Sequence, residues 1–250
     1  MRLKSYLLED RSIPVSTDAI HDFLSKDYSE AYTSFKKGDK IYRGRKFSQK
    51  ALITDPSKSY ERGSPYTTMN LNYYTLLFNN LPSWKKYPKR AIICTTNSRD
   101  AYGRGKCYVV FPKNGAKIGI CSSNDIWFSF EDELGGISLD TFNRYLYGLL
   151  RYINMGRSDG KWKEFIDACI VIDKNKEEIQ ERWNIPSWMD DYFGKDTPFI
   201  KYLDNLLSPE NNKFKLVKIS QFSAYKNKEV WTDSKCLLID NDIIDALDLP

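Results

Sequence analysis

Strand-like segments of this chain lie before residue 122 and after residue 212, and a long stretch of helical periodicity separates them. Apolar runs and alternating patterns predict strands at residues 40–44, 91–96, 107–111, 116–121, 213–222 and 229–239. Apolar residues three and four apart predict helices at residues 17–35, 67–80, 137–153, 161–183 and 197–207. This order predicts a single α+β domain over residues 1–250, with a helical insertion at about residues 135–210.

Turn-forming residues divide two of these strand regions. The sequence PKNG at 112–115 separates the third and fourth strands and has the composition of a hairpin turn. The sequence TDS at 232–234 divides the last region into two strand halves. In the first helix, Thr17 is the predicted N-cap, and Gly38 follows the end of the helical pattern.

The sequence lacks the features of membrane-spanning and secreted proteins. It has no run of about 18 apolar residues, and acidic residues interrupt its first 20 positions, where a signal peptide would be apolar. The five cysteines are odd in number, lie in apolar contexts and form no C-x-x-C pair. We therefore expect reduced core cysteines in a cytoplasmic protein.

The chain has a single histidine, His21, which lies in a predicted helix. Histidine is the usual zinc ligand and the usual general base near neutral pH. Its scarcity disfavours serine-hydrolase triads, histidine-based zinc sites and two-histidine nucleases, and His21 has the setting of a surface or half-buried helix residue. Any chemistry is therefore expected to use carboxylates, hydroxyls and arginines, without a metal ion.

The net charge of +5 is unevenly distributed. Residues 1–120 hold 22 Lys and Arg against 10 Asp and Glu, whereas residues 121–250 hold 16 against 23. The basic part is expected to meet an anion such as nucleic acid, a membrane surface or a phosphorylated cofactor. One hypothesis is a non-enzymatic nucleic-acid-binding module, in which the tyrosines of residues 70–74 and the basic run 85–90 hold a single strand.

Four short motifs occur in an order that points to another function. They are Ile41-Tyr42-Arg43-Gly44, then Ile93-Cys94-Thr95-Thr96-Asn97, then Ala101-Tyr102-Gly103, then Val-Val-Phe-Pro-x-x-Gly-Ala at 109–116. Together they resemble the mono-ADP-ribosyltransferases of the arginine, serine, glutamate class, which includes clostridial toxins that modify actin or Rho proteins and enzymes of T4-like bacteriophages. The resemblance covers roughly residues 39–121 and 213–239.

The resemblance implies a fold of two packed β-sheets with flanking helices, and a glycosyltransferase activity. NAD would be the substrate, nicotinamide would be released, and ADP-ribose would pass to a macromolecular acceptor, either a protein or a nucleic acid. A phage-encoded enzyme of this kind would act in the host cytoplasm. The family's middle motif is Ser-Thr-Ser, so Thr95 keeps a hydroxyl at the first position.

Each implied role has a physical basis in the residue type. An arginine on a strand, Arg43, can form paired charge-assisted hydrogen bonds with a pyrophosphate. Thr95 can hydrogen-bond a catalytic carboxylate and hold its geometry, and Tyr102 can stack on the nicotinamide ring. Gly44, Thr96 and Asn72 are further candidates for contact with NAD.

Two segments compete for the family's third motif, Glu-x-Glu or Gln-x-Glu. Glu131-Asp132-Glu133 is a literal match, and Asn227-Lys228-Glu229 is the other candidate. We favour Glu229, because it begins a strand-like segment, whereas Glu133 precedes Leu-Gly-Gly and a helical pattern. Glu229→Gln is expected to leave stability nearly unchanged, and Tyr225 is expected to be an exposed aromatic that contacts the acceptor.

We expect Arg43→Lys to weaken NAD binding while the fold survives, because a point ammonium cannot reproduce the paired hydrogen bonds of a guanidinium. Calorimetric titration of both proteins with NAD measures the effect, and circular dichroism checks the fold. An unchanged affinity would indicate that Arg43 belongs to a solvated basic run.

Overall fold

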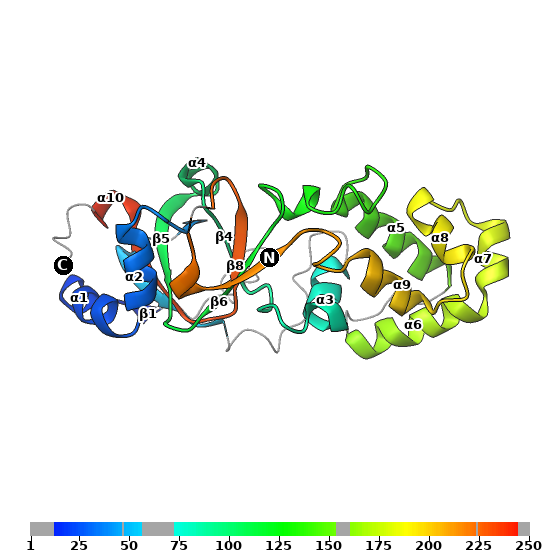
Figure 1. The fold of residues 1–250 in the computed structure, drawn as a ribbon, viewed down its shortest axis with the longest axis horizontal. Coiled ribbons are helices and arrows are strands. Elements are labelled where there is room, and N and C mark those ends of the chain that lie inside the picture. Colours follow the sequence, from blue (N-terminus) through cyan, green and yellow to red (C-terminus); the bar gives the residue numbers. More distant parts are fainter. Residues whose placement is uncertain (1–12, 47, 57–72, 154–160, 224, 245–250) are drawn as a thin grey trace, which may run out of the picture. The chain divides into compact units, whose positions relative to one another are not determined.

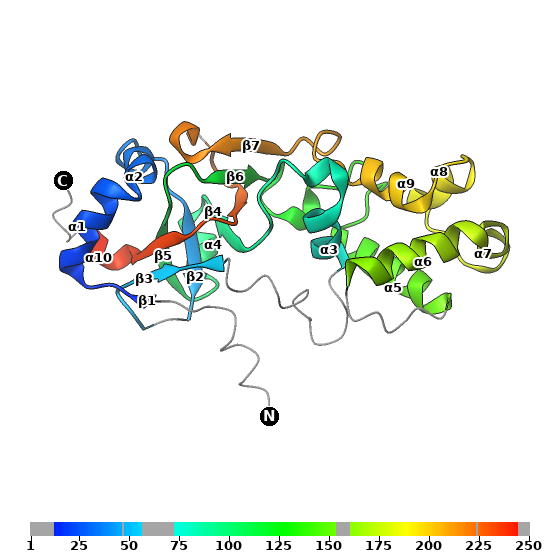
Figure 2. The same cartoon turned by 90° about the horizontal axis from the view of Figure 1, so that it is seen from below.

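The computed structural model describes residues 13–46, 48–56, 73–153, 161–223 and 225–244, and the chain divides into two compact units. The strand unit comprises residues 1–61, 87–124 and 215–250, and the helical unit comprises residues 62–86 and 125–214. Figures 1 and 2 show the elements of each. The class is α+β, as predicted, but the helical unit includes more of the chain than the expected insertion.

The described strands of the strand unit form one antiparallel sheet in the order β1-β3-β9-β5-β2-β4-β8-β6-β7. Their bounds are β1 (Ile13–Pro14), β2 (Tyr42–Arg45), β3 (Ala51–Thr54), β4 (Ile92–Thr95), β5 (Lys106–Pro112), β6 (Lys117–Ile120), β7 (Lys215–Lys218), β8 (Glu229–Thr232) and β9 (Cys236–Asp240). The predicted strands are present, although the one expected at 213–222 gives way to a 3₁₀ turn at Ile219–Gln221. Strands β1 and β3 were not predicted.

A single residue pair, Tyr42 with Thr95, joins β2 to β4. By contrast, β2 pairs with β5 over four residues, and β4 pairs with β8 over four. We call this junction the seam, because it links a block of five strands, β1-β3-β9-β5-β2, to a block of four, β4-β8-β6-β7. The prediction of two separate sheets is therefore wrong, because the described strands form one continuous hydrogen-bonded sheet.

The predicted hairpin at residues 112–115 is also wrong. Strand β5 pairs with β2 and β9, whereas β6 pairs with β7 and β8, so the turn carries the chain from one block to the other. Its residues bind elsewhere: Asn114 Nδ2 donates to the Lys26 carbonyl (2.7 Å), and Asn114 Oδ1 accepts from the Glu30 amide (3.0 Å). The turn therefore docks on the junction of the first two helices.

Helices α1 (Thr17–Lys26) and α2 (Ser29–Lys36) replace the single helix predicted at 17–35. The N-cap position of α1 is Ser16 rather than Thr17. Helix α2 lies beside β5 (Figures 1 and 2), and its Phe35 packs against Phe111 with ring centroids 5.5 Å apart. The short helices α4 (Ser98–Tyr102) and α10 (Asn241–Ile244) also contact β5.

Buried residues of both strand blocks belong to one hydrophobic core. Val110 and Leu238 come from the five-stranded block, whereas Ile118 and Val230 come from the four-stranded block. Residues of α1 and α2 complete this core, and all five cysteines of the chain are buried and free. Burial of about 20–30 residues of this kind is the main favourable term in the stability of the unit.

The helical unit contains α3 (Tyr73–Asn80), α5 (Leu139–Tyr152), α6 (Trp162–Lys174), α7 (Lys176–Arg182), α8 (Asp190–Phe193) and α9 (Phe199–Leu206). The predicted helix 161–183 is divided between α6 and α7 at Asn175. Helix α3 belongs to this unit because it packs on α5, where the Tyr73 amide donates to Asn143 Oδ1 (2.9 Å). No helix among the described residues is long and apolar enough to cross a membrane.

Gly44 allows α4 to pack closely on β2. A Cβ atom at Gly44 would lie 2.0 Å from the Ala101 carbonyl oxygen, so the strand or the helix would have to move. We expect Gly44→Ala to destabilise the protein by about 1–3 kcal/mol, the usual cost of overpacking. The matched control is Gly103→Ala, whose added Cβ meets nothing closer than 3.6 Å. Urea unfolding of both variants measures the difference, and equal stabilities would contradict the account.

Candidate active site

Thr95 and Glu229 lie directly opposite each other on neighbouring strands. Thr95 is the last residue of β4, Glu229 is the first residue of β8, and the two are a register pair of the ladder. Directly opposed residues of an antiparallel pair leave the same face of the sheet with Cβ atoms about 4.5–5.5 Å apart. The fold therefore brings together two predicted site residues that are far apart in sequence, and it does so at the seam.

The carboxylate of Glu229 is buried and paired with an arginine. Glu229 is 5% exposed and Arg90 is 8% exposed, and Arg90 Nη2 lies 2.5 Å from Glu229 Oε1. The Cys121 thiol is 4.0 Å from the same oxygen. A buried carboxylate is costly unless it is paired and hydrogen-bonded, and Arg90 supplies the compensating charge.

The expected hydrogen bond from Thr95 to Glu229 is not formed among the described residues. Thr95 Oγ1 accepts a hydrogen bond from the Asn97 amide (3.1 Å), so its hydroxyl proton is not used in that bond. Asn97 in turn caps α4, where its side chain accepts from the Arg99 amide. Thr95 thus keeps a donor on the face that it shares with Glu229, while Arg90 holds the carboxylate.

The segment Tyr87–Arg90, which we call the cover segment, packs on the face of β8 that carries Trp231 and Glu229. Trp231 leaves β8 on the same face as Glu229, two residues away, and its Nε1 donates to the Pro88 carbonyl (2.8 Å). The Tyr87 and Trp231 rings are stacked, with centroids 6.2 Å apart. The Lys89 amide donates to Asp233 Oδ2 (3.0 Å). These contacts bring the cover segment to the position from which Arg90 reaches Glu229.

Arg43 lies on β2, next to the seam, but faces the opposite side of the sheet. It follows Tyr42, the residue paired with Thr95, and successive strand residues alternate between faces. Arg43 lies against the Cys94 thiol, whose pKa burial raises to about 11, while the neighbouring guanidinium acts to lower it. The structure therefore does not bring Arg43 and Glu229 onto one face.

The Arg43 guanidinium is an unusual buried cation. Arg43 is 9% exposed, which excludes the solvated basic run as its setting, and its Nη1 has no hydrogen-bond partner among the described residues. No acidic side chain of the described residues forms an ion pair with it. A buried cation of this kind gains most from an anionic partner.

Three other candidates for NAD contact have different settings. Thr96 binds the residue before Glu229: its amide donates to the Lys228 carbonyl (2.9 Å), and its Oγ1 accepts from the Lys228 amide (2.9 Å). Gly44 is covered by α4, so its role in the fold is close packing. Asn72 lies outside the described residues.

Tyr102 of α4 is 45% exposed, and its hydroxyl is tied to the start of α10. The hydroxyl donates to Asp242 Oδ1 (2.7 Å) and accepts from Asn241 Nδ2 (3.0 Å). The Asp242 carboxylate also raises the pKa of Tyr102. These bonds hold the ring at the surface beside the strand that carries Thr95.

The competing glutamates lie elsewhere. Glu131 and Glu133 are in a turn of the helical unit, and Glu133 is exposed, so neither occupies a strand. The expectation for Tyr225 is wrong: the residue is half-buried, packs against the core and has its ring 5.4 Å from that of Phe222. Asn227, two residues before Glu229, adopts a left-handed backbone with φ 52°.

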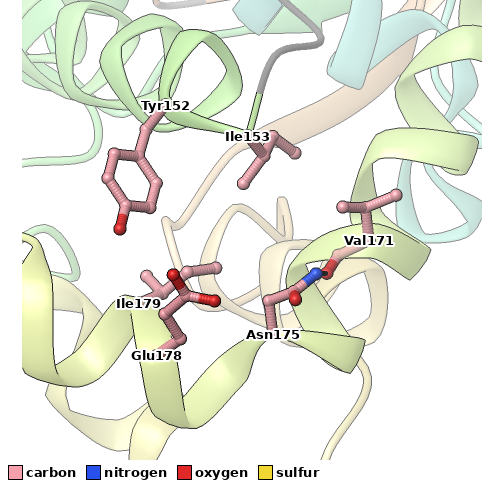
Figure 3. Close-up of a pocket in the computed structure, with 6 residues that line it drawn as sticks. All are labelled: Tyr152, Ile153, Val171, Asn175, Glu178 and Ile179. Atoms are coloured by element: carbon pink, nitrogen blue, oxygen red, sulfur yellow. Dashed lines mark hydrogen bonds between the residues drawn. The ribbon is translucent and has the colours of Figure 1, made fainter.

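A hollow of about 320 Å³ lies in the helical unit, where Figure 3 shows its lining. Its polar groups are already engaged: Asn175 Nδ2 donates to the Val171 carbonyl (2.8 Å), and Glu178 pairs with Arg182 (3.0 Å). Tyr152 stands at its edge and is 40% exposed. A ligand site needs convergent polar groups, and this hollow lacks them.

Within the described part of the chain, no group of three or more His, Cys, Asp or Glu residues is arranged to hold a metal ion. Comparisons with protein-family models, curated proteins and solved structures find no match to this chain. The sequence interpretation did not single out Arg90, the buried partner of Glu229, and used its basic run only in the alternative nucleic-acid-binding hypothesis. The one distinguishing signal of Arg90 is its position, directly before an apolar strand.

The buried ion pair gives a physical reason to revise the expectation that Glu229→Gln leaves stability nearly unchanged. Removing one partner leaves a buried, uncompensated charge, so Glu229→Gln and Arg90→Gln should each cost about 3–5 kcal/mol. The control is Glu178→Gln, which breaks an exposed helical ion pair and should cost less than about 1 kcal/mol. Urea unfolding measures all three, and a double variant that loses less than the sum of the single losses would show the coupling.

Proposed function

We propose that this chain is an NAD-dependent mono-ADP-ribosyltransferase that acts on a macromolecular acceptor. The observation that carries the proposal is the register pair of Thr95 with Glu229 at the seam. A hydroxyl residue and a glutamate from distant parts of the sequence meet on adjacent strands, and β2 with its arginine is the next strand. The proposed fold is that of the ADP-ribosyltransferases, with the two strand blocks in the place of the two sheets.

The proposed chemistry needs no histidine and no metal. The bond between nicotinamide and the ribose breaks, the pyridine nitrogen keeps the electron pair, and positive charge develops on the sugar. The Glu229 carboxylate stabilises that charge and accepts a ribose hydroxyl hydrogen bond. A nucleophile of the acceptor then bonds to the sugar carbon and releases its proton to solvent. The Thr95 hydroxyl proton is not used in the bond with Asn97, so in the reacting complex Thr95 would donate to the carboxylate and hold it in place of Arg90.

Arg43 is proposed to bind the pyrophosphate of NAD. The Arg43 side chain is buried, and the described residues offer its Nη1 no hydrogen-bond partner and the guanidinium no ion pair, so an anionic ligand is favourable there. Because only one residue pair joins β2 to β4, a ligand that separates them at the seam breaks few ladder hydrogen bonds. The pyrophosphate would thus reach a cation that lies on the face opposite Glu229.

Nicotinamide release from NAD tests the proposal, with and without added cell lysate. We expect Glu229→Gln to lower the rate by at least about 10²-fold, the scale of one lost preorganised electrostatic contact. Thr95→Ala should lower it by about 10-fold through loss of positioning and, unlike Glu229→Gln, leaves the buried ion pair intact.

The matched control is the double variant Glu131→Gln, Glu133→Gln, which alters two carboxylates of the helical unit and should retain the wild-type rate. A dead double variant together with an active Glu229→Gln would contradict the assignment. No turnover by any protein, together with polynucleotide binding whose log affinity falls steeply with log salt, would favour the nucleic-acid-binding hypothesis instead.

A further inference from the structure

The reactive carboxylate of the proposed enzyme is closed off in this structure. Glu229 is 5% exposed, although its proposed role requires contact with the ribose of NAD. Arg90 occupies Oε1 at 2.5 Å, and the Cys121 thiol lies 4.0 Å from the same atom. A ribose therefore has no approach to this oxygen while Arg90 stays in place.

Arg90 also neutralises the charge on which the proposed chemistry depends. A carboxylate stabilises a developing positive charge by its own negative field. A guanidinium in direct contact with that carboxylate opposes the field at short range, and the buried setting screens neither charge strongly. In the described arrangement Glu229 is thus both inaccessible and electrostatically compensated.

The cover segment contributes no residue to the hydrogen-bonded ladders of the sheet. Residues 87–90 belong to no helix and no strand, so their departure breaks no ladder pair. Their contacts with β8 and the turn that follows include the Tyr87–Trp231 stack and the two hydrogen bonds that Pro88 and Lys89 form. Opening has to overcome these contacts and the buried ion pair of Arg90 with Glu229, so the closed form predominates.

We propose that the cover segment Tyr87–Arg90 is an autoinhibitory strap, which holds the enzyme closed by placing Arg90 on Glu229. This inference rests on the proposed function. When the strap opens, Arg90 withdraws, Glu229 becomes accessible, and the Thr95 hydroxyl donates to the carboxylate in place of the guanidinium. Because only the open form turns over NAD, the measured rate is the intrinsic rate multiplied by the open fraction.

Variants at the strap anchors test the proposal without altering Arg90, Glu229 or Thr95. Tyr87→Ala removes the stacked ring, and Asp233→Ala removes the acceptor of the Lys89 amide. Each should raise the rate of nicotinamide release by about 3- to 10-fold, the range expected from the loss of one such contact. Tyr225→Ala is the control, since it deletes another half-buried tyrosine of the strand unit whose ring packs on a neighbouring ring, and it should not raise the rate.

Hydrogen–deuterium exchange of the peptide that contains residues 87–95 gives the second measurement. Both anchor variants should exchange faster there than the wild type. If both variants exchange faster and nicotinamide release is unchanged or lower, the autoinhibition proposal is wrong while the proposed function stands. Unchanged exchange in both variants also overturns the strap, because the anchors then do not hold it. No nicotinamide release by any of the proteins overturns the proposed function and the strap together.

Discussion

The strand unit depends on the return of the C-terminal strands into the middle of the sheet. Strand β8 lies between β4 and β6, and β9 lies between β3 and β5. Neither of these earlier strand pairs has a ladder of its own, so each block is continuous only after the last strands have inserted. The site depends on the same event, because Glu229 meets Thr95 only when β8 pairs with β4.

The positions of the strands other than β1 and β3 were predictable from the sequence, but the pairing partners of the strands were not. Apolar runs identified β4, β5, β6, β8 and β9, because a buried strand reads as a short apolar segment. The turn residues at 112–115 suggested local pairing, but Asn114 bonds to α1 and α2 and the flanking strands join different blocks. The residue types of a turn therefore do not show whether the two flanking strands pair with each other or with distant strands.

The site was also predictable only in part, because local sequence patterns place a residue on a strand but do not identify its distant partner. The placement of Glu229 on a strand followed from its apolar neighbours, and the structure places that strand beside β4. Arg90 was missed because its partner is 139 residues away in the sequence and a basic run usually marks a solvated surface. A buried ion pair contributes little stability over an apolar pair of similar volume, so residue periodicity gives no reason to expect one at this position.

The most direct test of the central claim is the product balance of a reaction with NAD labelled in its adenosine part. Purified protein, cell lysate and labelled NAD are incubated together, and free nicotinamide and label bound to macromolecules are both quantified. The account predicts that nicotinamide is released and that label appears on an acceptor in up to equal amount, both of which Thr95→Ala lowers. Nicotinamide and bound label no higher than in lysate alone would contradict it.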